Sequence, residues 1–367
     1  MKKNYSIAIV SFFEASDGGH GAAEVTLSLF DAIKFKKKLF EIKKNNIFKI
    51  LEKYKINVFE NIFKLFKIIN LIIDTRKFLK NSKKKIVIIE GASWIGYSFL
   101  TIKILKILDS NTLIIYHSHN IEYLLREKKN NFIISFISKI LEKKVYQISD
   151  IGTAVSEIDQ NILKKLYGVD STIFYNGISK RKLKISLFKK KIPKDYIIYF
   201  GSYSFFPNKH AIDYIINNIF PIVRKKHPNL KLVIVGKDLP HNIIEKNKDI
   251  YFYKNIKKKY LNFLISKSKF LLAPMFKATG TKLKIIETLM LGSIVITSRE
   301  GISGISLSKK ISPPFIFTNK KEVFNLINIV LKNNKLLKKK AKIRSNFFIK
   351  KYCMENIVKN FFRNLNL

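Results

Sequence analysis

The sequence is poor in the residues that form covalent cross-links and tight turns. Among 367 residues it has one cysteine, Cys353, together with 14 glycines and 8 prolines. A single cysteine excludes an intrachain disulfide and a cysteine-based metal site, which fits a reducing compartment. The scarcity of glycine and proline argues against long linkers and disordered segments. Since 47% of the residues are hydrophobic, the chain can fill ordinary cores, and its length predicts two domains.

Long hydrophobic runs are also missing. No stretch reaches the roughly 18 uninterrupted apolar residues of a membrane span, and residues 63–73, the nearest candidate, are interrupted by two lysines and an asparagine. The start of the chain imitates a secretory signal, but its apolar run is short and acidic residues follow without a cleavage site. We therefore expect a first β-strand there and a cytoplasmic protein.

Acidic residues are scarce compared with basic ones. The chain has 26 Asp and Glu against 70 Lys and Arg, a formal net charge of +44. Such a surface attracts nucleic acid, anionic lipid and phosphorylated ligands. The excess is almost all lysine and accompanies abundant Ile, Asn and Phe, so an AT-rich genome explains it simply, and an anionic membrane surface is the functional alternative. Lysine triplets such as residues 36–38 are scattered without a known RNA or DNA module, so we expect no specific nucleic-acid partner.

Short apolar runs alternate with longer helical patterns along the whole chain. The runs are rich in β-branched residues without strict alternation, as in strands buried on both faces of a parallel sheet. Repeated strand–helix alternation predicts an α/β fold with two Rossmann-like, doubly wound parallel sheets. The expected strands are residues 6–13, 86–90, 113–116, 151–154, 172–175, 197–201, 230–236, 250–253, 270–274, 293–297 and 315–317.

A domain boundary is expected near the turn Asn176-Gly177, which a lysine-rich stretch follows before the next strand. We predict a first domain at residues 1–178 and a second at residues 179–345. The helix expected at residues 346–367 has no strand after it, so we expect it to pack back on the first domain.

Two strand-to-helix connections have residues suited to phosphate, because ligands of such sheets bind at the carboxyl ends of strands near helix N-termini. In the first connection, Gly18, Gly19 and Gly21 precede a helix. Glycines let backbone N–H groups approach an anion closely. Neither a dinucleotide fingerprint nor a Walker loop is present, so a plain tight turn is the alternative.

The second connection follows the expected strand at residues 270–274. A loop containing Gly280 and Thr281 leads into a helix expected at residues 282–291, which Gly292 ends in the C′ position.

Glu287 stands beside the predicted buried stripe of this helix. One interpretation is an ion pair with Lys284 at i, i+3. The other is a carboxylate that faces the hydroxyls of a ligand, while loop amides with Lys282 or Lys277 hold phosphate.

These segments resemble a known family. Residues 279–287, 292–297 and 301–304 resemble the donor site of retaining GT-B glycosyltransferases of family 4, also called glycosyl transferases group 1. Further segments agree with the family in order and spacing: residues 200–211, 219–221, 227–228 and 232–236 in the second half, and Gly18-Gly19, His119-Asn120-Ile121-Glu122, 155–156 and 175–178 in the first.

The resemblance implies a GT-B fold, in which an N-terminal acceptor-side domain and a C-terminal nucleotide-sugar-binding domain face a cleft. It implies transfer of a hexosyl group, with retention, from a nucleotide diphosphate sugar to a glycan or lipid-linked acceptor, as in polysaccharide or lipopolysaccharide biosynthesis. It implies no permanently bound cofactor, and the sequence shows no cluster of metal ligands. A cytoplasmic enzyme that is peripheral on the membrane would fit.

For the donor, the resemblance implies that Glu287 hydrogen-bonds the ribose hydroxyls. Lys282 and the amides around Gly280 and Thr281 would face the diphosphate.

For the first domain, the resemblance implies that Gly18 and Gly19 close over the diphosphate. His119 would stand near the transferring sugar as the catalytic residue, with His117 a weaker candidate. The alternative for each histidine is to cap a strand end and contact nothing.

Three positions depart from the family. Thr279, Ser179 and the pair Ile302-Ser303 stand where many relatives carry an acidic residue, which leaves the sugar open. Two rival functions also stay open. A nucleotide-sugar epimerase of the same architecture would convert the sugar without an acceptor, and a non-enzymatic basic protein would bind membrane or nucleic acid without protection by nucleotide sugars.

Overall fold

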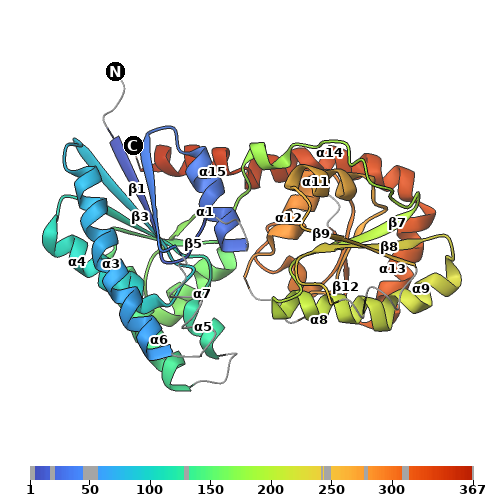
Figure 1. Cartoon of the computed structure of the whole chain (residues 1–367), viewed down its shortest axis with the longest axis horizontal. Coiled ribbons are helices and arrows are strands. Elements are labelled where there is room, and N and C mark those ends of the chain that lie inside the picture. The colour runs from blue at the N-terminus through green and yellow to red at the C-terminus, as the bar shows by residue number, and fades with distance from the viewer. Residues whose placement is uncertain are drawn as a thin grey trace. The chain divides into compact units, whose positions relative to one another are not determined.

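The computed structural model describes residues 5–16, 21–43, 57–127, 132–240, 243, 249–276, 280–307 and 314–365, without the side chains of residues 57–62. The chain divides into two compact units. The first contains Met1–Gly177 together with Ile357–Leu367, and the second contains Ile178–Asn356 (Figure 1).

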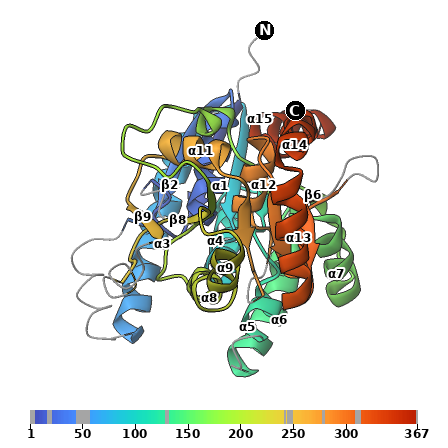
Figure 2. The ribbon, with the colours of Figure 1, turned by 90° about the vertical axis from the view of Figure 1, so that its right-hand side faces the viewer.

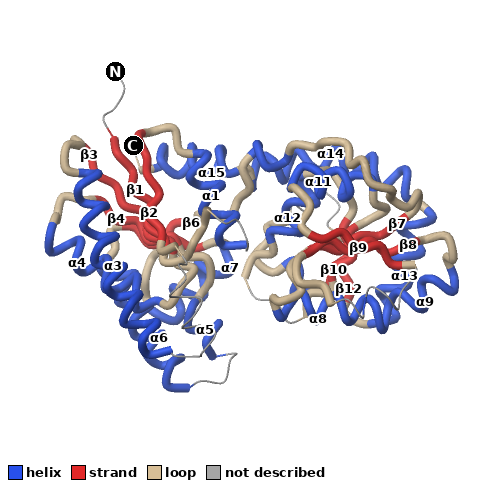
Figure 3. Tube along the Cα trace, viewed as in Figure 1, coloured by secondary structure: helices blue, strands red, loops and turns tan. Residues whose placement is uncertain are grey.

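The first unit is built on a six-stranded parallel sheet in the order β2-β1-β3-β4-β5-β6 (Figure 3). Its central strands are almost wholly buried because helices cover both faces, as the unbroken apolar runs predicted. The strands are β1 (Tyr5–Ser11), β2 (Lys36–Glu41), β3 (Lys84–Glu90), β4 (Leu113–His117), β5 (Ile151–Ala154) and β6 (Thr172–Ile173).

Helices α1 and α15 lie on one face of this sheet, and α3, α4 and α6 lie on the other (Figure 1). Phe361 of α15 packs edge-on against Phe174, and Phe362 against Phe35. The helices of this unit are α1 (Gly21–Ala32), α3 (Asn57–Leu79), α4 (Ile95–Leu108), α5 (Glu122–Glu127), α6 (Phe132–Ile148), α7 (Glu157–Tyr167) and α15 (Met354–Asn364).

Strand β2 is the strand that the sequence did not predict. It carries the lysine triplet of residues 36–38, which the sequence offered as scattered charge and not as part of a strand. Because β2 pairs only with β1, it is an edge strand, and Lys36 and Lys38 are exposed there. Charged side chains on an edge strand discourage pairing with another chain. They also interrupt the apolar run by which a strand is recognised in a sequence.

The second unit repeats the plan with the order β12-β11-β10-β7-β8-β9, again all parallel. Its strands are β7 (Tyr196–Phe200), β8 (Lys231–Gly236), β9 (Ile250–Lys254), β10 (Leu271–Ala273), β11 (Val295–Ser298) and β12 (Phe315–Phe317).

Helices α11, α12 and α14 cover one face of the second sheet, and α8 and α9 cover the other (Figure 1). Helix α13 packs on β11 and β12, and α14 follows it almost directly (Figure 2). The helical segments are η1 (Lys180–Leu183), α8 (Phe206–Tyr214), the π-turn η2 (Ile215–Ile219), α9 (Phe220–Lys226), α11 (Lys258–Lys267), α12 (Leu283–Met290), η3 (Arg299–Ile302), α13 (Lys320–Lys332) and α14 (Asn334–Tyr352).

The predicted architecture of two doubly wound parallel sheets is confirmed. Each predicted apolar run contains a strand, although β1 ends at Ser11 and β6 at Ile173, two residues earlier than predicted in both cases. No helix in the described part of the chain combines the length and the hydrophobicity that crossing a membrane requires.

Two helices end with a glycine in the left-handed conformation. Gly292 has φ 70° after α12, which confirms the predicted C′ position, and Gly168 has φ 68° after α7. Their surroundings differ. A Cβ at Gly292 would lie 3.1 Å from the Cα of Lys342 in α14, whereas a Cβ at Gly168 would meet nothing within 4 Å.

Replacing these glycines separates the backbone cost from the packing cost. Gly168→Ala should destabilise the protein by about 1 kcal/mol because alanine disfavours the left-handed conformation. Gly292→Ala should cost roughly 1 kcal/mol more, because α12 and α14 must also move apart. Differential scanning calorimetry measures both losses, and equal losses would contradict the crowding at Gly292.

Candidate functional site

Strands β3 and β4 end side by side with polar residues. Glu90, the last residue of β3, is in register with His117, the last residue of β4. Adjacent parallel strands have their carboxyl ends at the same edge of a sheet. The apolar interiors of the two strands therefore deliver a carboxylate and an imidazole to one place, and His119 follows two residues later.

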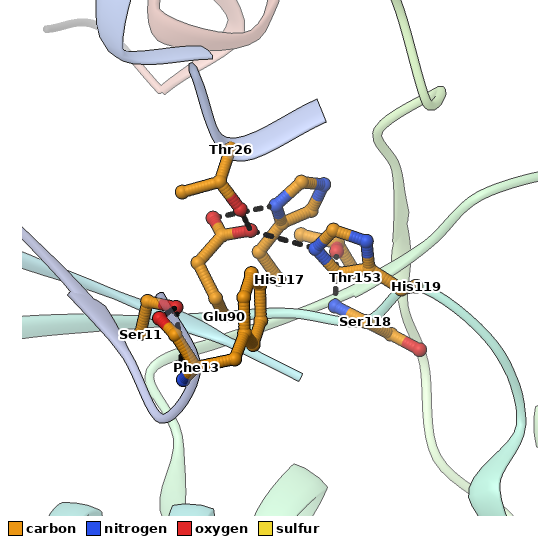
Figure 4. A network of polar contacts seen from close by, with 8 residues as sticks. All are labelled: Ser11, Phe13, Thr26, Glu90, His117, Ser118, His119 and Thr153. Atoms are coloured by element: carbon orange, nitrogen blue, oxygen red, sulfur yellow. Dashed lines mark hydrogen bonds and ion pairs between the residues drawn. The ribbon is translucent and has the colours of Figure 1, made fainter. Parts of the chain in front are cut away.

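Glu90 is the centre of this cluster (Figure 4). His117 Nδ1 lies 3.0 Å from Glu90 Oε1, and His119 Nε2 lies 2.6 Å from Oε2. The hydroxyl of Thr26 in α1 donates to the same Oε2 at 2.7 Å. All four side chains are buried, and Glu90 is completely so.

Burial and pairing oppose each other in this cluster. Burial alone would raise the pKa of Glu90, but its interactions with His117 and His119 hold that pKa well below the usual range. Burial lowers the pKa of His119, and the carboxylate of Glu90 offsets this only in part. At neutral pH the cluster therefore holds an ionised Glu90 beside a neutral His119.

The ionised carboxylate fixes the roles of the imidazole nitrogens. Since a carboxylate only accepts hydrogen bonds, His119 donates from Nε2 and keeps Nδ1 as its acceptor. His117 donates from Nδ1, and its buried Nε2 has no hydrogen-bond partner among the described residues. The alternative in which the histidines only cap strand ends was wrong, because both bind Glu90.

By distance alone, this cluster could also hold a cation. One ligand atom each from Glu90, His117 and His119 lies within 4.8 Å of the others. The hydrogen bonds from Thr26 and both histidines already satisfy the carboxylate, so the arrangement is stable without an ion. The expectation of no metal stays a prediction.

In the second unit, the start of α12 follows the carboxyl end of β10. Gly280 has φ 64°, and Lys282 is the buried N-cap residue of α12 without a side-chain capping bond. The hydroxyl oxygen of Thr281 is buried and has no hydrogen-bond partner among the described residues. The uncapped helix start and this hydroxyl can both donate to an anion.

Glu287 is buried in the middle of α12, and its partner comes from α11. Lys258 Nζ lies 2.7 Å from each carboxylate oxygen of Glu287, and the Lys258 side chain is 34% exposed. The interpretation that Glu287 pairs with Lys284 was wrong. The Glu287 side chain is 3% exposed, so of this pair it is Lys258 that is open to solvent.

Lys284 points instead into the unit. Its Nζ donates to Asn208 Oδ1 at 2.6 Å and to the Tyr199 hydroxyl at 2.8 Å, and it lies 4.3 Å from the centre of the Tyr199 ring. The residue as a whole is half-buried, whereas its ammonium group is enclosed, and this burial lowers the pKa of Lys284 to about 7. The sequence offered this lysine only as a partner of Glu287, not as a buried group.

The same network fixes the loop after β7. Asn208 Nδ2 donates to the carbonyl oxygen of Ser202 at 3.0 Å, and the Tyr199 hydroxyl donates to Asn208 Oδ1 at 3.0 Å. Lys284 therefore connects the start of α12 to α8 and to the loop at the carboxyl end of β7.

Several predicted positions are not placed by the structure. Gly18 and Gly19 lie outside the described residues, as do Lys277 and Thr279. A hollow of about 320 Å³, lined by Asp195, His227 and Lys269 among others, lies at the amino ends of the strands and contains none of the predicted site residues.

Comparison with known proteins gives a family match in the second half of the chain. Residues 194–327, a little over one third of the chain, match the family model of glycosyl transferases group 1. The comparison with curated proteins found no similar sequence.

Solved structures match over nearly the whole chain. Anabaena Alr3699/HepE in complex with UDP has a TM-score of 0.68 at 10% identity, with 98% of this chain and 99% of that chain covered. Sucrose-phosphate synthase from Thermosynechococcus elongatus has a TM-score of 0.71 at 13% identity with the same coverage. The chain has the GT-B fold. A glycosyltransferase from Rickettsia africae agrees, with a TM-score of 0.64 at 13% identity over 99% of this chain and 98% of that one.

The matched segment contains most of the candidate site residues of the second unit. It includes Lys258, Gly280, Thr281, Lys282 and Glu287. The family match therefore lies on the unit that contains α12.

Replacing Lys284 by methionine should stabilise the second unit at low pH. The folded state holds Lys284 at a pKa of about 7, against about 10.5 for an ordinary lysine, so between these values only the unfolded state binds the proton. The cost of burying the charge is therefore complete below pH 7 and is relieved as the pH rises. Lys284→Met should gain about 1–3 kcal/mol below pH 7 and little near pH 10, because Tyr199 and Asn208 still bond each other.

Urea unfolding at the two pH values measures this gain, and Lys350→Met, at an exposed lysine of the same unit, is the control. A gain that is independent of pH, or equal in the control, would contradict the buried charge.

Proposed function

We propose that this chain is a retaining glycosyltransferase of family 4 that moves a hexosyl group from a nucleotide diphosphate sugar to a glycan or lipid-linked acceptor of the cell envelope. The observation that carries the proposal is the family match over residues 194–327, the segment in which α12 and its preceding loop hold a buried carboxylate beside possible anion donors. The resemblance of the first half of the chain to the same family supports it.

The proposed donor site lies at the start of α12. Glu287, held by Lys258, accepts hydrogen bonds from the ribose hydroxyls, because its oxygens have lone pairs beyond those facing the lysine. Thr281, Lys282 and the amide of Gly280 hold the diphosphate, where the helix dipole also favours negative charge. The family resemblance also assigns Gly18 and Gly19 to the diphosphate.

Catalysis then rests on stabilising the leaving group. As the sugar–phosphate bond breaks, negative charge grows on the diphosphate, and fixed donors at a helix start stabilise this charge more than they stabilise the substrate. The family resemblance implies that the departing phosphate itself accepts the proton of the acceptor hydroxyl. No step therefore requires a second carboxylate close to the first.

The proposed role of His119 is to contact the transferring sugar through Nδ1. Glu90 is then a positioning residue, because it binds Nε2 and so fixes both the ring orientation and the tautomer. Thr26 and His117 hold the carboxylate in place from two further elements.

The donor role of Glu287 is tested by calorimetry with UDP, the nucleotide bound in the Anabaena HepE structure. Glu287→Gln should weaken UDP binding by roughly tenfold or more, because charge-assisted hydrogen bonds to the ribose are lost. Asp195→Asn is the matched control: Asp195 is also paired with one lysine, Lys269, but stands at the amino end of β7. Unchanged affinity in Glu287→Gln would refute this role.

The roles of His119 and Glu90 are tested with the nucleotide sugar that a thermal-shift screen selects, by the rate of nucleotide release. His119→Ala should lower the rate by about 100-fold with little change in UDP affinity. Glu90→Gln should move the acidic limb of the pH–rate profile to lower pH, since the carboxylate raises the pKa of His119.

A Glu90→Gln profile that only falls in height would leave Glu90 a structural residue. Mass spectrometry of the product separates transfer from epimerisation, because an epimerase forms a new nucleotide sugar without any acceptor.

A further inference from the structure

One face of the first unit is apolar and exposed. Helices α3, α4 and α6 lie side by side on the same face of the sheet, α4 in contact with both of the others (Figure 1). We call their outer surface the α3–α4–α6 face. Its exposed apolar side chains include Phe66, Ile69, Ile107, Phe132, Ile133 and Phe136.

In the first half of α6 the apolar side chains face the solvent and the serines face the unit. Phe132 is 83% exposed and Ile133 is 70% exposed, whereas Ser135 and Ser138 are buried against the unit. A helix that served only the core would place the phenylalanine inside and the serines outside. Such an exposed apolar patch marks an interaction site.

Buried hydrogen bonds keep α6 in this orientation. Glu142, one turn after Ser138, accepts from the backbone amides of Glu122 and Tyr123 at 2.8 and 3.1 Å and from the Tyr167 hydroxyl at 2.7 Å. A rotation of α6 that buried its phenylalanines would break all three bonds and leave the start of α5 without its cap. The apolar residues therefore stay outside.

The charge around this face is mainly positive, although Asp74 of α3 is exposed. Helices α4 and α6 contain one acidic residue, Glu142, and it is buried. The same helices carry five lysines, Lys103, Lys106, Lys139, Lys143 and Lys144, of which Lys106 is paired with Asp150. Apolar side chains interspersed with lysines match an anionic bilayer, in which lipid tails receive the former and lipid phosphates the latter.

We propose that the α3–α4–α6 face docks this protein on an anionic lipid bilayer. The proposal rests on the proposed function, because a lipid-linked or envelope acceptor is presented at such a surface. A second copy of the chain fits the face less well, since a two-fold contact brings two mainly basic faces together. Docking uses side chains that stand at the interface and requires no membrane-spanning helix.

The experiment compares two matched double variants of the full chain in vesicle co-sedimentation. Ile133→Ser with Ile137→Ser removes side chains that are 70% and 42% exposed on α6. The control, Ile343→Ser with Ile329→Ser, removes side chains that are 68% and 47% exposed in the second unit. The vesicles contain phosphatidylcholine alone or phosphatidylcholine with phosphatidylglycerol.

Wild type and control should bind the vesicles that contain phosphatidylglycerol and should bind phosphatidylcholine alone much more weakly. The α6 variant should bind the anionic vesicles roughly tenfold more weakly, and Lys143→Gln with Lys144→Gln should weaken binding in the same direction. Equal binding to both vesicle types, or an α6 variant that binds like the control, would overturn the proposal.

Two further measurements separate the possible failures. If size-exclusion chromatography shows that the wild type is a dimer and the α6 variant a monomer, and the dimer binds no vesicles, then the face serves self-association. Calorimetry with UDP on the same variants tests the donor site independently. Vesicle binding without UDP binding would refute the proposed function and leave the docking face standing.

Discussion

A carboxylate that leaves water must find hydrogen-bond donors within the protein, and this requirement organises both units. Glu90 takes its donors from α1 and from the end of β4, and Glu287 takes its lysine from α11. Glu142 takes two amides from the start of α5. Each acid therefore joins elements that the hydrophobic core alone would leave free to shift. Lys284 is the reverse case, a buried lysine whose ammonium group donates to a phenol and an amide rather than to a carboxylate, and its lowered pKa is the consequence of that burial.

The fold could be predicted almost completely because burial on both faces leaves a strong mark on a strand. Runs as rich in β-branched residues as those of β3 and β8 are typical of strands that are buried on both faces. The exception is the edge strand β2, which pairs with β1 and carries three lysines. Its side chains are partly solvated, so its sequence lacks the apolar run of a buried strand. Apolar runs in a sequence indicate buried strands, and they are weaker in an edge strand.

The candidate site could be predicted only in part, for a physical reason. Sequence spacing finds neighbours along one helix, so it offered Lys284 as the partner of Glu287, three residues away. The actual partner, Lys258, comes from another helix, and only the packing of α11 on the same face brings it close. Glu90 was visible as the end of a strand, but its pairing with His117 depends on the register of β3 and β4, which no local pattern specifies.

The first unit is finished by the end of the chain. Helix α15 supplies Phe361 and Phe362, which pack against Phe174 and Phe35 of a unit whose other elements precede Gly177. A ribosome that adds about 5–20 residues per second needs on the order of tens of seconds to synthesise the intervening second unit. Throughout that interval the nascent first unit lacks the aromatic contacts that α15 provides. Loss of α15 would thus damage the unit whose other elements were synthesised first.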